Sequence, residues 1–211
     1  MAGKTFIAIP CMDQVPAPFM ASLAQLRDDD LIMGVNVGSL IYNSRNELAK
    51  RAIATESEFC LWLDSDMVFQ PDLLKRLKKH FENPETEIVS GVYFRRSTPY
   101  TPVLYDKLEI DAKGNCEFHE LETLPKDDKP FEVAGIGFGG VLMRTSVLMD
   151  VFGLHRMPFA PINGVGEDLS FCWRAREAGH KIICDPTIEL GHVGHITVNR
   201  QFYDVFHKER G

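Results

Sequence analysis

Long hydrophobic runs are missing from this sequence. Its most apolar stretches, at residues 6–10 and 59–63, are far shorter than the ~20 residues that a membrane-spanning helix requires. The first residues also lack the apolar core and the small-residue cleavage site of a secretory signal. The sequence therefore predicts neither a transmembrane segment nor a secretory signal.

Paired cysteines are missing as well. The five cysteines are an odd number and include no Cys-x-x-Cys pair, which argues against both a disulfide framework and a zinc knuckle. They are Cys11, Cys60, Cys116, Cys172 and Cys184. We expect them to be small core side chains in a reducing compartment, which favours a cytoplasmic location.

An excess of positive charge is the third absence. With 30 acidic and 23 basic residues the formal charge is −7, so nothing attracts polyphosphate in general and nucleic acid is not the default partner. The hydrophobic content of 45% is enough to bury a core, so the chain is expected to be folded. No linker or composition shift divides it, and we expect a single domain over residues 1–211.

Short apolar runs alternate with segments of helical spacing along most of the chain. Runs typical of strands lie at residues 6–10, 31–37, 58–63 and 88–94, with helical patterns between them. This alternation predicts an α/β fold with an open, mostly parallel sheet, helices on both faces and ligands beyond the carboxyl ends of the strands. Residues 97–131, rich in Pro, Asp, Lys and Gly, are expected to form a small antiparallel excursion.

One helix start is predicted from a capping pattern. Ser44 is a suitable N-cap, and Glu47 stands three residues later, as in a capping box. This prediction places Arg45 and Asn46 in the first turn of the helix.

The segment Asp64, Ser65, Asp66 is the strongest local signal for chemistry. Two carboxylates separated by one residue can both reach one hard cation, and Mg²⁺ or Mn²⁺ is a natural bridge to a diphosphate. Acidic turns without any ligand are common. The position directly after the apolar run at 58–63 nevertheless favours a metal site.

At these residues the chain resembles a known family. The run from Phe59 to Phe69, with its two aspartates, is similar to the strand and Asp-x-Asp motif of GT-A-fold (nucleotide-diphospho-sugar transferase) glycosyltransferases, particularly the family-2-like group. Further segments follow in the order of that family, and only residues 97–131 match poorly. They are residues 6–10, 44–46, 89–95, 135–140, 166–174 and 191–192.

The resemblance implies a role for each matching residue. Asp64, Asp66 and His192 would bind Mn²⁺ or Mg²⁺, with Asp66 the firmer ligand and Asp64 holding ribose or metal. The donor is expected to be a nucleotide-sugar, a UDP-sugar above others. Its binding residues would be Pro10, Cys11, Met12, Asp13, Arg45, Asn46, Asp64, Ser65, Gly139 and Gly140.

Plain structural interpretations stand beside several of these roles. Arg45 could be a solvated charge at a helix end, Asn46 a cap, and the glycines of 135–140 a simple turn. A lone loop histidine, such as His192 or His195, is usually a polar surface group.

Aromatic and basic residues near the motifs have the same two interpretations. Trp62 and Trp173 are expected to pack rather than to stack on a sugar. Arg95 and Arg96 could reach the diphosphate or an acidic acceptor, although exposed cations after a strand are common.

Glu167 and Asp168 resemble the Glu-Asp motif of inverting family members. A sugar hydroxyl is a poor nucleophile until a positioned base removes its proton, and Asp168 is our candidate for that base. Glu167 would bind acceptor or donor. The alternative is that two acids in the first turn of a helix are favoured by the helix dipole alone.

The chain departs from the family in two respects. It has no Gln-x-x-Arg-Trp motif and no membrane helix, so we expect a non-processive enzyme. The C-terminal acceptor helix of many relatives is missing or reduced to residues 201–208, which leaves a homo-oligomer or a partner chain to complete the acceptor site. The acceptor itself stays open among glycan, lipid-linked sugar, protein and modified nucleic acid.

Two other functions remain as alternatives. A nucleotidyltransferase also uses paired aspartates to hold a metal against phosphates, but it would have no use for a base at Asp168. A catalytically silent binding or interaction module could have kept the fold, since fold does not determine function.

Overall fold

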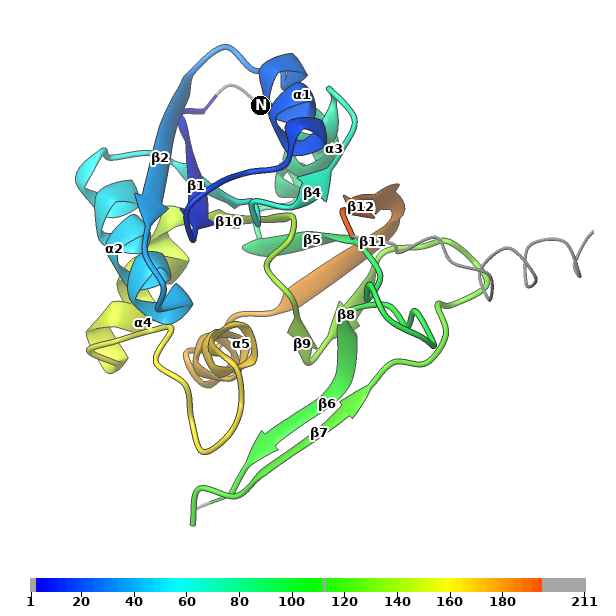
Figure 1. Ribbon diagram of the computed structural model, residues 1–211. Helices are drawn as coiled ribbons and strands as arrows, with labels where there is room; N and C mark the ends of the chain where they lie inside the picture. Colours follow the sequence, from blue (N-terminus) through cyan, green and yellow to red (C-terminus); the bar gives the residue numbers. More distant parts are fainter. Residues whose placement is uncertain (1–2, 112, 195–211) are drawn as a thin grey trace, which may run out of the picture.

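A seven-stranded sheet runs through the molecule in the order β2-β1-β3-β10-β5-β11-β8 (Figure 1). The structure is a computed structural model, and it describes residues 3–111 and 113–194. The strands of this sheet are β1 (Thr5–Cys11), β2 (Leu31–Val37), β3 (Phe59–Trp62), β5 (Ile88–Val92), β8 (Phe131–Val133), β10 (Val141–Arg144) and β11 (Ile182–Glu189). The helices are α1 (Ala17–Gln25), α2 (Ile41–Ala54), α3 (Leu73–Lys79), α4 (Thr145–Leu154), α5 (Glu167–Glu177) and the 3-10 turn η1 (His80–Glu82).

The predicted parallel sheet is confirmed, with two exceptions. Strand β1 pairs in parallel with β2 and β3, and β5 pairs in parallel with β11. Strand β10 lies between β3 and β5 and is antiparallel to both, and β8 is antiparallel to β11. The direction of a short buried strand is set by its neighbours, so the apolar run of β10 alone did not reveal it.

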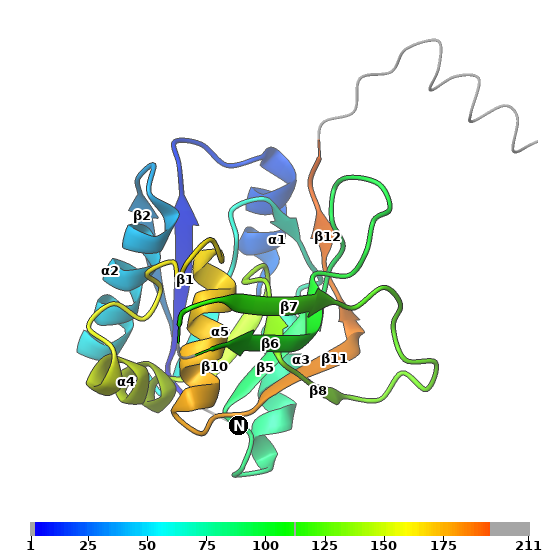
Figure 2. The ribbon, with the colours of Figure 1, turned by 90° about the horizontal axis from the view of Figure 1, so that it is seen from below.

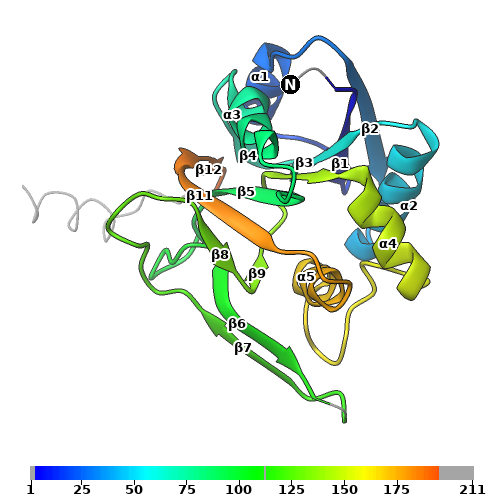
Figure 3. The same ribbon diagram turned by 180° about the vertical axis from the view of Figure 1, so that it is seen from behind.

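Helices cover both faces of the sheet, as the alternating pattern predicted (Figure 3). In β1, Phe6 and Ala8 point to the face covered by α2, α4 and α5, whereas Ile7 and Ile9 point to the face covered by α1 and α3. Successive side chains of a strand point to opposite faces, so a strand buried on both sides is apolar throughout. None of the helices in the described part of the chain is long and apolar enough to cross a bilayer.

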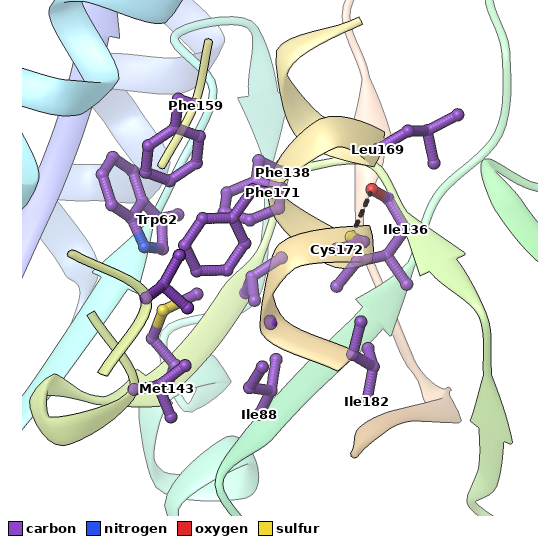
Figure 4. Packing of buried hydrophobic residues seen from close by; sticks show 14 of the residues in the cluster. Trp62, Ile88, Ile136, Phe138, Met143, Phe159, Leu169, Phe171, Cys172 and Ile182 are labelled. Carbon is purple, nitrogen blue, oxygen red and sulfur yellow. Dashed lines mark hydrogen bonds between the residues drawn. The ribbon is translucent and has the colours of Figure 1, made fainter. Parts of the chain in front are cut away.

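An aromatic cluster holds α5 against the sheet (Figure 4). Phe171 of α5 stacks on Phe159 with ring centroids 4.5 Å apart, and Trp62 of β3 contacts Phe159 at 5.0 Å. Phe138 contacts Trp62, Phe159 and Phe171 edge to face. Such pairs add about 0.5–1.5 kcal/mol each to the burial of the rings. The packing fixes where α5 begins, and Glu167 is its first residue.

A second, three-stranded sheet lies beside α5 (Figure 2). It contains β6 (Leu104–Ile110), β7 (Cys116–Glu120) and β9 (Gly135–Ile136), all antiparallel, and it is the expected antiparallel excursion. The hairpin tip is fixed by Asn163, whose Nδ2 donates to the Gly114 carbonyl at 2.6 Å. The tip is therefore joined to the loop that leads into α5.

Two very short strands, β4 (Met67–Val68) and β12 (Gly191–His192), form the remaining antiparallel pair. The backbone N–H of Val193 also donates to the Asp66 carbonyl at 2.8 Å. This pairing was not predicted. It brings His192 to the loop that follows β3.

The predicted capping box at Ser44 is wrong. Helix α2 begins at Ile41 with Leu40 as its N-cap, so Ser44 and Arg45 lie one turn inside the helix. The Ser44 hydroxyl accepts a hydrogen bond from Asn36 Nδ2 at 3.1 Å, and Ser44 is 1% exposed. Strand β2, through Asn36, uses the hydroxyl that the sequence pattern had assigned to a cap.

Candidate functional site

A pocket of about 290 Å³ lies beyond the carboxyl ends of β1 and β3. Open α/β sheets bind ligands at this edge, so the position is the expected one. The pocket is built from segments far apart in the sequence. Its lining is Pro10, Met12, Ile41, Arg45, Asp64, Ser65, Asp66, Arg96, Glu167 and His192.

Arg45, Asp64 and Glu167 form what we call the buried cluster. Arg45 Nη2 donates to Asp64 Oδ1 at 2.7 Å, and Arg45 Nε donates to Glu167 Oε1 at 3.2 Å. The guanidinium also lies 5.1 Å from the Phe138 ring and 5.8 Å from the Trp62 ring. Burial alone would lower the pKa of Arg45, but Asp64 and Glu167 outweigh it and leave that pKa raised. One permanently charged side chain therefore joins the tip of β3 to the start of α5.

Asp66, Arg96 and His192 form a second group, the open cluster. Asp66 Oδ2 lies 2.9 Å from Arg96 Nη1 and 3.4 Å from His192 Nε2. Burial would raise the pKa of Asp66, but hydrogen bonding to His192 and the charges of His192 and Arg96 outweigh it and lower that pKa. The hydrogen bond to Asp66 raises the pKa of His192, although burial opposes it. The carboxylate of Asp66 is therefore ionised and faces the Arg96 guanidinium and the His192 ring.

The ring of His192 is oriented by the backbone. His192 Nδ1 donates to the Phe94 carbonyl at 3.0 Å, which leaves Nε2 on the side of Asp66. Metal-binding histidines are usually held in this way, with one nitrogen bonded to a carbonyl and the other free for the ion. Tyr93 supports the ring edge to face, at 5.4 Å between centroids.

The residues at the open cluster suit a divalent ion that is partly coordinated by its substrate. Carboxylate oxygen and imidazole nitrogen are both acceptable ligands for Mn²⁺. In residues 3–111 and 113–194, no three His, Cys, Asp or Glu side chains are grouped as a metal cage. An ion at Asp66 and His192 would need further oxygens, and a diphosphate with water can supply them.

Asp168 lies next to the buried cluster, in the first turn of α5. Burial and the neighbouring charge of Glu167 raise the pKa of Asp168 from 3.8 to about 6, although the Leu169 N–H and Arg45 oppose the shift. The Leu169 N–H donates to Asp168 Oδ1 at 2.8 Å. Asp168 is thus a carboxylate at neutral pH and a stronger base than an ordinary aspartate.

Comparison with known proteins identifies the family. A model described as glycosyl transferase family 2 matches residues 39–152, which is more than half of the chain. The chain belongs to this family. The matched region contains both aspartates of the pocket and Arg45, whereas Glu167, Asp168 and His192 lie beyond it.

The curated relatives that match this glycosyltransferase have low sequence identity to it. The chain is 25% identical over 144 residues to the pre-mycofactocin glycosyltransferase of Mycobacterium tuberculosis, strains CDC 1551 / Oshkosh and H37Rv. The match covers 66% of this chain and 27% of the relatives, so the chain spans only about a quarter of their length.

Solved structures agree on the fold. The crystal structure of A197 from STIV superposes with a TM-score of 0.60 at 19% identity, over 93% of this chain and 97% of that one. GalNAc-T7, crystallised with UDP, GalNAc and Mn²⁺, superposes with a TM-score of 0.62 at 12% identity, over 92% of this chain and 44% of that one. The fold is the GT-A fold that the sequence resemblance implied.

The family motifs do not all contribute residues to the pocket. Pro10, Met12 and Ser65 line it, in line with the sequence. Cys11 points into the protein, with its Sγ 3.4 Å from the Gln14 carbonyl, and Asp13 is exposed in the loop after β1 without lining the pocket. Neither placement supports the predicted role in donor binding.

Asn46 has a structural role instead of the predicted donor contact. It is 3% exposed, its Nδ2 donates to the Tyr42 carbonyl at 2.8 Å, and its Oδ1 accepts from the Phe159 N–H at 3.1 Å. Because α2 begins earlier than predicted, Asn46 lies in the second turn and faces the core. It holds the segment before α5 against α2.

The glycine-rich segment makes room for Tyr93, which the sequence did not mark as important. A Cβ at Gly137 would lie 1.9 Å from the Tyr93 hydroxyl, and a Cβ at Gly139 would lie 2.8 Å from its ring. At Gly140 a Cβ would meet Leu190 at 2.5 Å. These close contacts with protein side chains explain why both positions need glycine, and the donor-binding role of Gly139 and Gly140 stays a prediction.

The structure also places the aromatic and basic residues that the sequence analysis discussed. Trp62 is fully buried, as expected, and Trp173 packs against the core cluster without lining this pocket. Ile41 lines the pocket without any sequence signal, and Arg96 is part of the open cluster. His195 lies outside the described residues.

Proposed function

We propose that the chain is a metal-dependent, inverting and non-processive glycosyltransferase that moves a sugar from a nucleotide-sugar, first of all a UDP-sugar, to an acceptor hydroxyl. The observation that carries the proposal is the convergence of the buried and open clusters on one pocket at the carboxyl ends of β1 and β3. Family membership and the GT-A fold support the same reaction class.

Arg45 is the proposed contact for the donor diphosphate. Its Nη1 is buried and has no hydrogen-bond partner among the described residues. A buried donor without an acceptor costs about 1–3 kcal/mol. Because this nitrogen is out of contact with solvent, a phosphate oxygen would pair with it after a small movement of the guanidinium, and the pair would relieve that penalty. Pro10 and Met12 border the same pocket, where the nucleotide base would lie.

Asp66 and His192 are the proposed metal ligands, and Asp64, whose Oδ1 accepts from Arg45, lines the same pocket. A divalent ion bound there would neutralise the charge that develops on the leaving nucleoside diphosphate. Support comes from the orientation of His192 by Phe94 and from the Mn²⁺ in the GalNAc-T7 structure of the same fold. Manganese or magnesium would both suit these ligands.

Asp168 is the proposed base. Its pKa of about 6 leaves it ionised at neutral pH and able to accept the proton of the acceptor hydroxyl. Glu167 is held by Arg45 and is the proposed contact for donor or acceptor. Direct attack by the activated hydroxyl on the anomeric carbon would invert its configuration.

Ligand-dependent thermal stability tests the donor and metal together. A ligand that binds only the folded state raises the melting temperature in proportion to the logarithm of its concentration over Kd. We expect UDP to stabilise the protein with Mn²⁺ and much less without it. No shift with any nucleoside diphosphate or nucleotide-sugar would contradict the proposal.

The products distinguish the two alternatives. A nucleotidyltransferase would release pyrophosphate, whereas glycosyl transfer or slow donor hydrolysis releases a nucleoside diphosphate. A silent binding module would show the thermal shift without any product. The proposed location of the protein is the cytoplasm, because its five cysteines are free and four of them are buried.

A further inference from the structure

A larger cavity of about 650 Å³ opens directly beside the proposed active site. It shares Arg96 and His192 with the donor pocket, and it is lined further by Phe94, Arg95 and Tyr100. A molecule lying in this cavity would therefore contact two residues of the open cluster. The cavity is large enough for a sugar residue and its substituents.

The charge of this cavity is unusual for the protein. Among the described residues, its lining contains two arginines and no carboxylate, although the chain as a whole has a formal charge of −7. Four other cavities in the described part of the chain each contain at least two carboxylates. The cavity beside His192 is thus less acidic than the other four, although its two arginines already pair with Glu120 and Asp66 outside the lining.

The two arginines have unused donors. Within residues 3–111 and 113–194, both contacts of Arg96 are made by Nη1, to Asp66 and to the Val193 carbonyl, so Nε and Nη2 remain for a ligand. Arg95 uses Nε for Glu120 and Nη2 for the Tyr105 hydroxyl. The side chains are 49% and 42% exposed, respectively, so a guanidinium can pair with a carboxylate or phosphate without a large cost of burial.

Two aromatic side chains complete the cavity. Tyr100 is 60% exposed and Phe94 is 38% exposed, and both line the cavity. Aromatic faces pack against the apolar face of a sugar ring, and the hydroxyl of Tyr100 adds a hydrogen-bonding group. Aromatics together with arginines fit a sugar that carries an acidic group better than a neutral sugar or a simple anion.

We propose that this cavity is the acceptor subsite and that it selects a sugar acceptor bearing a carboxylate or phosphate group. The proposal rests on the proposed function, since it names the acceptor class for that reaction. Arg96 would be the specificity-determining residue, because it belongs to both pockets and has two donors to offer. Tyr100 would provide the stacking surface.

Direct binding of small acidic sugars tests the subsite. Wild-type protein with UDP and Mn²⁺ would be titrated with glucuronate, glucose 1-phosphate and the neutral methyl glucoside, followed by ligand-observed NMR. We expect at least one acid to bind about tenfold more tightly than the methyl glucoside, with Kd below about 10 mM. Comparison of the glucuronate and glucose 1-phosphate titrations then shows whether the site prefers a carboxylate or a phosphate.

Variants locate the binding. Arg96→Gln and Tyr100→Ala should each weaken binding of the acid at least about fivefold, whereas Arg156→Gln, an exposed arginine after α4, should leave it unchanged. Because Arg96 contacts Asp66, the Mn²⁺ affinity of Arg96→Gln is measured separately. Tyr100→Ala has no such contact in the described residues and gives an independent test.

Three results would overturn the proposal: equal binding of neutral and acidic sugars, no binding of either acid at about 10 mM, or unchanged binding in both variants. If UDP and Mn²⁺ do not bind wild-type protein, the proposed function fails instead. The same titrations without nucleotide would still decide whether the cavity takes acidic sugars.

Discussion

The buried and open clusters lie in one pocket but differ in how firmly their charges are held. In the buried cluster the side chain of Arg45 is 3% exposed and has aromatic rings beside it. In the open cluster Arg96 is 49% exposed and meets Asp66 through a single nitrogen. Fixed charge in a dry environment stabilises the same charge distribution throughout a reaction, whereas an exposed pair can exchange partners. The comparison suggests that the buried cluster positions the donor and that the open cluster accepts metal and acceptor.

The largest expected effect comes from the open cluster. Asp66→Ala should remove the proposed metal ligand and reduce Mn²⁺-dependent release of UDP from a UDP-sugar by about 1000-fold, the upper range for loss of one electrostatic group. Folding should change little, because the Asp66 side chain is 27% exposed and its partner Arg96 is 49% exposed. The control is Asp29→Ala, an exposed aspartate before β2. Wild-type turnover in Asp66→Ala would end the metal assignment.

A substitution in the buried cluster should act on the free energy of unfolding instead. Arg45→Met would leave Asp64 and Glu167 facing each other without their shared cation, and breaking a buried pair in this way costs about 3–5 kcal/mol. Urea denaturation measures this change. Arg51→Met, an exposed arginine on the same helix, should lose far less. Equal losses in the two variants would mean that the clusters do not differ as we infer.

Asp168→Asn separates binding from transfer. The amide keeps the shape of the carboxyl group but cannot accept a proton, so we expect transfer to fall by at least about 100-fold. Binding of UDP and Mn²⁺ should change little, since the buried and open clusters stay intact. Collapsed donor affinity with high residual transfer would show that Asp168 is not the base.

The glycine-rich segment links core packing to the open cluster. In Gly139→Ala the new Cβ would lie 2.8 Å from the Tyr93 ring, and overpacking of this kind costs about 1–3 kcal/mol. Because Tyr93 supports His192, Mn²⁺ binding should weaken too. Gly153→Ala is the matched control: nothing lies within 4 Å of its Cβ, and alanine in helix α4 should be neutral or stabilising. Unchanged Mn²⁺ affinity in Gly139→Ala would show that the position of Tyr93 does not affect the metal site.

Local features of the site could be predicted from the sequence, and long-range ones could not. Asp64 and Asp66 follow an apolar strand directly, and a strand's end determines where the next residues lie. The role of Gly139 depends on Tyr93, and the place of His192 depends on the pairing of β12 with β4. Ser44 shows the same limit, since its hydroxyl is used by Asn36 of another strand. No pattern in a single segment contains such partners.

The pH dependence should show the smallest effects, and they run in opposite directions. A base with a pKa of about 6 is lost to protonation in acid, so transfer should fall about tenfold for each pH unit below 6. The contribution of Asp168 to the free energy of unfolding should instead be larger in acid than at neutral pH. The folded protein holds the Asp168 proton more tightly than the unfolded chain, whose aspartate has the ordinary pKa of 3.8.

The contribution of Asp168 to stability is therefore fully present below pH 3.8 and is lost as pH rises through about 6. Asp168→Asn has no proton to lose, so it should remove this dependence and be more stable than wild type at pH 7. Urea denaturation of both proteins between pH 4 and pH 7, at about four pH values, measures the difference. If the two curves stay parallel, Asp168 titrates as an ordinary aspartate, and the buried cluster exerts no field on the proposed base.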